Sequence, residues 1–214
     1  MIPHSSCKLP PLEEGAPAKL SLIHDFVRAI LNGNRQFMQF TLRTTVITVE
    51  DIESFLMEWI GSSLLSFVSD VYYEADHDDM LNCSAEDVTW MIRSFIAMGA
   101  DPNKAGRNGK LPLYSTISNS VCDSILFQRE LIKGGADIFK EDCYDTSFVD
   151  AILTDLEGGG LELITLLIAP WVPDETKLKL IACVRSSAPL NHVFEDHPSD
   201  KSSDDNLITL LKET

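Results

Sequence analysis

The chain has 214 residues, of which 44% are hydrophobic and 23% charged, and its formal net charge is −16. This length and hydrophobic content allow a continuous core and exclude a wholly disordered protein. The negative charge repels phosphate backbones and anionic membranes, so we expect no direct nucleic-acid binding. A protein partner with a neutral or basic surface fits the charge better, although the acidity alone can serve to keep the chain soluble.

Location and cofactor content are also constrained by composition. The first 17 residues lack the basic and apolar regions of a secretory signal. No apolar stretch approaches the roughly 20 residues that span a bilayer, so no membrane insertion is expected. The five cysteines contain no CxxC pair, which is typical of reduced thiols. We therefore expect a cytoplasmic protein, with the nucleus also open, and no cofactor.

Residues 1–16 form a polar segment, and two predicted helices follow on either side of Gly33. Residues 48–60 predict an additional helix, because Thr48 and Asp51 have the spacing of a capping pair. Residues 64–73 predict a further helix, and residues 76–83 a polar loop. Because the spacing between helix pairs is longer here than elsewhere, we interpret residues 46–83 as an insertion.

The next helix is the clearest in the chain. Its start resembles a capping pair, Ser84 and Asp87, and Gly99 supplies a left-handed stop. Its apolar residues lie at the i, i+3, i+4, i+7 spacing of one helical face, namely Val88, Met91, Ile92, Phe95 and Ile96.

The sequence Gly-Ala-Asp occurs at residues 99–101 and again at residues 135–137, each time after an apolar helical segment. The same phase places a third apolar segment at residues 161–168, ended by Pro170. A unit that recurs at a period between about 20 and 50 residues is typical of a stacked-repeat protein. We therefore predict an all-α helical repeat solenoid at residues 17–186, of about four units with a 36-residue period plus the inserted helix.

Beyond the third segment, residues 174–184 predict another helix. Residues 187–214 are interpreted as an acidic linker, richest in charge at 195–205, and a short capping helix at 207–212.

Residues 99–114 resemble an ankyrin repeat. Gly109 falls at that family's loop-tip glycine, and Pro112, Leu113 and Tyr114 match its Pro-Leu-His step with tyrosine in place of histidine. Residues 161–167 are similar to the family's second helix and residues 21–24 to its opening. The period of 36 exceeds the roughly 33 residues of the family, and residues 146–150 keep the threonine-like start but lose the proline and histidine.

The resemblance implies a non-catalytic scaffold, an adaptor or inhibitor that binds a partner protein through loop tips and the exposed face of the first helices. Phe139 and Tyr144 are the stronger candidates, because exposed aromatic residues are typical anchors; packing under an adjacent loop is the alternative for Phe139. The full set of implied partner-binding residues is Asn103, Lys104, Arg107, Asn108, Tyr114, Phe139, Glu141, Tyr144 and Asp150.

A metal-dependent hydrolase is the enzymatic alternative. His24 with Asp25, and His77 with Asp78 beside Asp76 and Asp79, form His-Asp pairs. His24 also falls where the repeat has a structural histidine, and the second cluster lacks the spacing of a calcium loop. His192 and His197, near Glu195 and Asp196, lie in a predicted polar loop. We expect neither a metal site nor catalytic residues.

Two further patterns in the sequence bear on function. Gly158, Gly159 and Gly160 follow a predicted helix and precede no Lys-Ser/Thr, so a turn fits them better than a phosphate loop. The acidic clusters at residues 70–79 and 195–205 raise the alternative of a nucleic-acid mimic that inhibits a basic protein. Mimicry would require carboxylates spread over one face, whereas these gather in an inserted loop and a linker.

Overall fold

The computed structural model describes residues 9, 11, 15–44, 46–77, 83–117, 121–154, 166–167 and 169–186. Every regular element in these ranges is a helix, and an isolated bridge between Glu141 and Ser147 is the extent of β pairing there. The predicted all-α class is confirmed for this part of the chain. Its contacts divide the chain into one compact unit at Met1–Phe148 and a second at Val149–Thr214, and each is described by itself.

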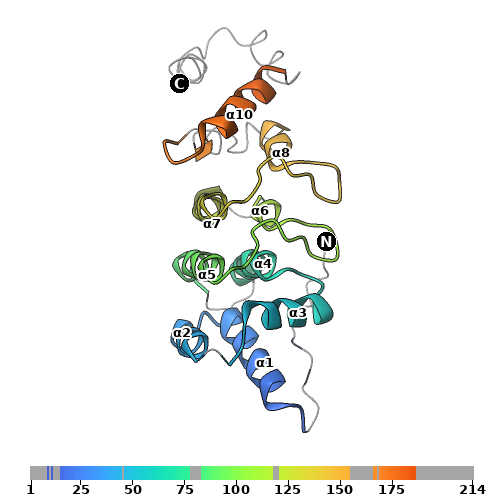
Figure 1. The fold of residues 1–214 in the computed structure, drawn as a ribbon, viewed down its shortest axis with the longest axis vertical. Coiled ribbons are helices and arrows are strands. Elements are labelled where there is room, and N and C mark those ends of the chain that lie inside the picture. Colours follow the sequence, from blue (N-terminus) through green and yellow to red (C-terminus); the bar gives the residue numbers. More distant parts are fainter. Residues whose placement is uncertain are drawn as a thin grey trace. The chain divides into compact units, whose positions relative to one another are not determined.

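The first unit contains two rows of helices (Figure 1). The first row consists of α1 (Ala18–Leu31), α4 (Leu64–His77) and α6 (Pro112–Ser115). The second row consists of α2 (Arg35–Arg43), α5 (Ala85–Ala97) and α7 (Val121–Lys133). Helices of the two rows pack in the pairs α1 with α2, α4 with α5, and α6 with α7, while α4 also packs on α6 and α5 on α7.

One helix belongs to neither row. The inserted helix α3 (Val49–Trp59) contacts both α1 and α4, and the predicted helix at residues 48–60 is confirmed. Thr48 caps it by accepting a hydrogen bond from the Asp51 N–H at 3.2 Å, and Asp51 accepts from the Thr48 N–H at 2.9 Å. Ser84 and Asp87 form the same reciprocal pair at the start of α5, as the sequence predicts.

The core of the first unit lies between the two rows. Phe26 of α1 and Phe95 of α5 are fully buried, with ring centroids 6.1 Å apart. Full burial of an aromatic or aliphatic side chain contributes about 1.5–3 kcal/mol. The apolar face that the sequence predicts for α5 is largely the face that is buried, since Val88, Met91, Ile92 and Phe95 are all inaccessible to solvent.

The 36-residue recurrence is present in the backbone hydrogen bonds after α5 and α7. The Ala100 N–H donates to the Phe95 carbonyl at 2.9 Å, and the Ala136 N–H donates to the Leu131 carbonyl at 3.0 Å. The N–H groups of Gly99 and Gly135 each donate to the carbonyl three residues earlier, at 2.9 and 3.0 Å. Both helices therefore end in the same closing turn.

The starts of the first-row helices and of α8 (Phe148–Thr154) share a second recurring feature. Each helix begins three residues after a residue with positive φ. These residues are Gly15 (φ 91°), Gly61 (77°), Gly109 (74°) and Asp145 (53°). The chain thus has a left-handed residue at the same distance before α1, α4, α6 and α8.

Two predicted boundaries differ from the structure or lie outside it. Helix α4 continues to His77, so the polar loop does not begin at residue 76; Glu74 and Ala75 favour helix and extend it. In the second unit, α10 (Asp174–Ser186) confirms the helix predicted at residues 174–184. Most of the segment at 161–168, the glycines at 158–160 and the whole of 187–214 lie outside the described residues.

Candidate interaction surface

The loops that follow α5 and α7 are joined side by side through Asn103. Its side-chain amide donates to the Gly135 carbonyl at 2.9 Å, and its amide oxygen accepts from the Asp137 N–H at 2.7 Å. The Lys140 ammonium donates to the Asn103 carbonyl at 2.8 Å. Residue 103 of one loop therefore sets the position of the next loop.

The tips of the two loops have the same hairpin-like closure. The Gly106 N–H donates to the Lys110 carbonyl, and the Asp142 N–H donates to the Thr146 carbonyl, both at 3.1 Å. The tips also touch, because a Cβ added to Gly109 would overlap the Cβ of Cys143. No side chain fits at residue 109 without displacing the neighbouring tip.

Helix α3 extends this arrangement by one further element. The Lys104 ammonium lies 3.3 Å from the buried Glu53 carboxylate of α3, and the Arg107 N–H donates to the Gly61 carbonyl at 2.7 Å. On another side, α3 is tied to Lys19 of α1, whose ammonium lies 2.8 Å from the Asp51 carboxylate. We refer to residues 57–61, 101–110 and 137–146 together as the loop row.

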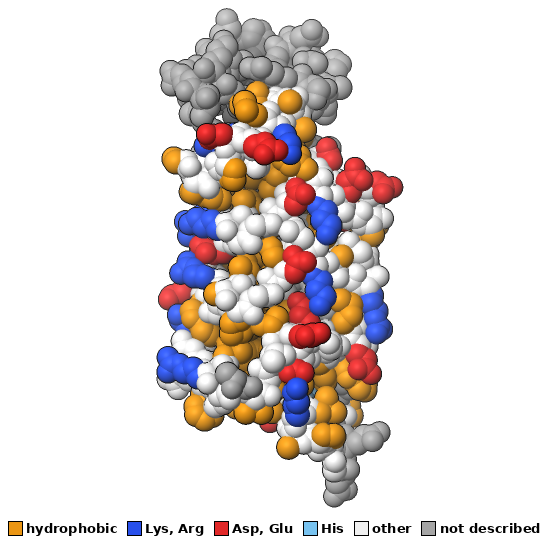
Figure 2. All heavy atoms as spheres, viewed as in Figure 1, with side chains coloured by type: hydrophobic (Ala, Val, Ile, Leu, Met, Phe, Trp, Pro, Cys, Tyr) orange, Lys and Arg blue, Asp and Glu red, His pale blue; other side chains and the backbone are white. Residues whose placement is uncertain are grey.

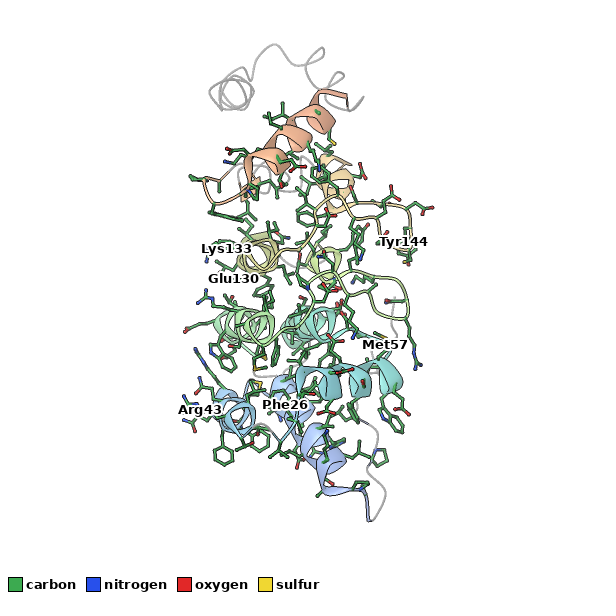
Figure 3. The ribbon with its side chains drawn as sticks, in the orientation of Figure 1. Phe26, Arg43, Met57, Glu130, Lys133 and Tyr144 are labelled. Carbon is green, nitrogen blue, oxygen red and sulfur yellow. The ribbon has the colours of Figure 1, made fainter. Side chains whose placement is uncertain are left out.

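Two large aromatic side chains of the loop row are exposed. Tyr144 is 72% exposed and Trp59 is 54% exposed. The backbone beneath Tyr144 is fixed, because the Tyr144 N–H donates to the Asp142 side chain at 2.8 Å. Figure 3 shows that Tyr144 and Met57 point away from the side of the unit on which Arg43 and Lys133 lie.

The tip around Tyr144 carries negative charge. Glu141 and Asp145 are both exposed on either side of it, and Figure 2 shows acidic side chains where the loop projects. In contrast, Lys104, Lys110 and Lys140 have partners within the unit, namely Glu53, Asp70 at 3.6 Å and the Asn103 carbonyl. An aromatic side chain flanked by carboxylates is suited to a neutral or basic partner surface.

The residues named from sequence fall into several groups. Asn103, Lys104 and Asn108 make bonds within the unit; Asn108 accepts from the Lys110 N–H at 3.0 Å. Arg107, Glu141 and Tyr144 are exposed on the loop row. Phe139 and Tyr114 are half-buried, and burial raises the pKa of the Tyr114 hydroxyl. Asp150 is exposed on α8 in the second unit and is therefore described apart from the others.

Trp59 is the residue that sequence reasoning missed. It lies one turn after Phe55 on the apolar face of α3, and their ring centroids are 6.3 Å apart. That spacing predicts a core position for both. Phe55 is indeed buried, but Trp59 ends the helix and is left largely uncovered, which no periodic pattern within α3 could indicate.

The residues named for the enzymatic alternative lie partly within the described ranges. His24 is buried, and its ring meets Phe55 edge-on at 6.3 Å. Among the described residues, no group of three or more His, Cys, Asp or Glu side chains could hold a metal ion. Asp78, Asp79, His192 and His197 lie outside those residues.

Of the acidic clusters that raise the mimicry alternative, Asp70 is paired with Lys110, and residues 195–205 lie outside the described ranges.

Comparisons with protein families, with curated proteins and with solved structures found no match to this chain. Within the described residues, none of the helices combines the length and apolar character required to cross a membrane.

Proposed function

We propose that this chain is an ankyrin-like helical-repeat scaffold, an adaptor or inhibitor without catalytic activity, that binds a partner protein through the loop row. The architecture is supported by the recurrence of the closing turns after α5 and α7 and of the positive-φ residues before the first-row helices. In such arrays each unit buries its apolar face against its neighbours and the loops are left to bind.

One observation carries the binding proposal. The loop row holds Tyr144 and Trp59 exposed on a backbone that is fixed by hydrogen bonds between its parts. Buried aromatic anchors dominate the energetics of many interfaces, and a preorganised backbone lowers the entropy cost of binding. The partner is expected to present an apolar pocket with basic or neutral surroundings, and the chain is expected to act in the cytoplasm.

Affinity capture with variants tests this proposal. Partners are captured from a lysate with wild-type protein, with the single variants Tyr144→Ala and Trp59→Ala, and with the double variant Phe139→Ala, Tyr144→Ala. Loss of a hot-spot aromatic costs about 2 kcal/mol or more, so a specific partner should be depleted in the Tyr144 and Trp59 variants.

The matched control is Leu178→Ala. Leu178 is 67% exposed on α10 in the second unit, so its loss removes a large exposed hydrophobic side chain outside the loop row. Capture that is unchanged by the loop-row variants, or lost equally in Leu178→Ala, would remove the loop row as the binding surface.

A further inference from the structure

Each second-row helix has an arginine at the same position. Counting from the first residue of each helix, the ninth is Arg43 in α2, Arg93 in α5 and Arg129 in α7. Side chains at the same position of stacked helices face the same way, because the helices repeat with the same packing. The recurrence therefore predicts that these three arginines form a line across the second row.

Side-chain contacts show that the three helices are neighbours. Arg35 of α2 lies 3.8 Å from the Glu86 carboxylate of α5, and its guanidinium is 4.8 Å from the centre of the Trp90 ring. Arg93 of α5 donates to both oxygens of Glu130 on α7, at 3.1 and 3.0 Å. Lys133 lies one turn after Arg129, and we refer to Arg43, Arg93, Arg129 and Lys133 as the arginine column.

The arginine column is positively charged although the chain carries −16. Glu130 is the single carboxylate in three segments of these helices, namely the whole of α2, residues 88–97 of α5 and residues 124–133 of α7. The Glu130 side chain is only 7% exposed and lies against two arginines. The Arg129 Nε is 3.5 Å from its carboxylate, and the other arginine, Arg93, has a side chain that is 63% exposed. The four cations of the column and this one carboxylate together carry a net charge of +3.

An exposed apolar side chain accompanies these cations. Phe40 lies three residues before Arg43, so the two share a face of α2, and Phe40 is 69% exposed. Figure 3 shows Arg43 and Lys133 on the side of the unit away from Tyr144, and Figure 2 shows Lys and Arg side chains at the levels of α2, α5 and α7.

We propose that the arginine column binds an extended acidic segment of a partner protein in which carboxylates alternate with apolar residues. Packed helices lie about 8–10 Å apart. A segment in the polyproline II conformation advances about 3.1 Å per residue with three residues per turn, so carboxylates at every third residue face the column and meet successive arginines. Arg43 is exposed and can bind a carboxylate through two parallel hydrogen bonds. Arg93 already binds Glu130 through its Nε and one terminal nitrogen and offers the segment its other terminal nitrogen. Phe40 meets an apolar residue between the carboxylates.

The charge of the whole chain selects between acidic ligands. A nucleic acid carries a dense line of phosphates that the −16 charge repels. A short acidic peptide carries few charges, so the chain repels it less. At 0.15 M salt, repulsion between the peptide and distant carboxylates of the chain is screened beyond about 8 Å, while its direct contacts with the arginine column persist. This surface lies on the second row and does not depend on whether the loop row binds its own partner.

Fluorescence anisotropy with the whole chain tests the inference. The probe is a labelled 12-residue peptide of repeated Glu-Ser-Leu, compared with a peptide in which Gln replaces Glu and with a 12-nucleotide single-stranded oligothymidine. We expect the Glu peptide to bind at least about tenfold tighter than the Gln peptide and than the oligothymidine, since charged pairs supply specificity. Equal binding of the two peptides, or tighter binding of the oligothymidine, overturns the proposal.

Charge-reversal variants separate the column from the overall charge. Arg43→Glu should weaken Glu-peptide binding about fivefold or more, and Arg43→Glu with Lys133→Glu further still. Arg28→Glu is the matched control, because Arg28 is an equally charged and exposed arginine on α1, in the first row. Equal loss in Arg43→Glu and Arg28→Glu would overturn the proposal. Circular dichroism checks folding, and Arg43→Gln replaces Arg43→Glu if the latter unfolds.

Discussion

Gly109 and Asp145 lie 36 residues apart and adopt the same left-handed backbone conformation, with φ of 74° and 53°. Each lies three residues before a helix, α6 or α8, and each donates its N–H to the carbonyl three residues earlier, at 3.0 and 3.2 Å. One backbone geometry is therefore reached by two different residues. Asp145 reaches it at an energetic cost that glycine does not incur.

Exchanging these two residue types has opposite expected effects. Gly109→Ala should lower the free energy of unfolding by about 2–4 kcal/mol, because alanine is strained at positive φ and its Cβ would meet the Cys143 Cβ. Asp145→Gly should raise it by about 0.5 kcal/mol by removing strain. Urea unfolding measures both, and a Gly109→Ala variant as stable as wild type would contradict the described tip contact.

Asn103 should be more important for stability than its position in a loop suggests. Asn103→Ala removes the bonds to the Gly135 carbonyl and the Asp137 N–H, at an expected cost of about 1–3 kcal/mol. Asn108→Ala is the matched control, because Asn108 bonds only the Lys110 N–H within its own loop. Equal unfolding free energies for the two variants would show that the bond between loops contributes little.

Much of the helix pattern could be predicted from sequence, because helix periodicity and capping are local. The caps at Thr48 and Ser84 and the closing turns after α5 and α7 were all predicted from residues within a few positions of each other. The role of Asn103 could not be predicted, since its hydrogen-bond partners lie 32 and 34 residues away in the next loop. Trp59 likewise fits a buried stripe within α3, but it is the last residue of the helix and is 54% exposed.

The arginine column too depends on relationships between elements. Arg43, Arg93 and Arg129 share a position only once the starts of three helices are known. The spacing between Arg43 and Arg93 includes the inserted helix and therefore departs from the 36-residue period. A fixed period in the sequence aligns Arg93 with Arg129 but not with Arg43.

Stability should fall on acidification through Glu130. Hydrogen bonds from Arg93, with the charges of Lys133 and Arg129, hold the pKa of this carboxyl below its ordinary value of 4.5. A depressed folded-state pKa contributes stability that is complete above the unfolded pKa and is lost as pH falls through the folded one. We expect the free energy of unfolding of wild type to decline below about pH 5.

Glu130→Gln is the variant that isolates this contribution. It should be less stable than wild type at pH 7 by about 1–2 kcal/mol, and the difference should shrink as pH falls toward 3. Urea unfolding at pH 7, 5 and 3 measures this. A difference that stays constant with pH would mean that the charge of Glu130 does not stabilise the fold.

The two capping boxes should contribute similarly to stability. Thr48→Ala and Ser84→Ala each remove the hydroxyl that accepts the N–H of Asp51 or Asp87, at 3.2 Å in both cases, and each should cost about 1 kcal/mol. Ser54→Ala is the control, because Ser54 is exposed within α3 and alanine there favours helix by a few tenths of a kcal/mol, about 0.4. If thermal unfolding shows that Ser54→Ala destabilises the protein as much as Thr48→Ala and Ser84→Ala do, the assignment of the two capping boxes is contradicted.

Photo-crosslinking from the loop row tests the binding proposal most directly. A benzoylphenylalanine at residue 144 or 59 replaces an exposed aromatic of the loop row, and one at residue 40 replaces the exposed aromatic of α2. We predict that residues 144 and 59 crosslink the same partner protein in cells, and that excess unlabelled wild-type chain, but not its Tyr144→Ala variant, competes for it. Crosslinks to different partner proteins from residues 144 and 59 would contradict the assignment of the loop row as one binding surface. So would the absence, at both residues, of a crosslink that excess wild-type chain reduces.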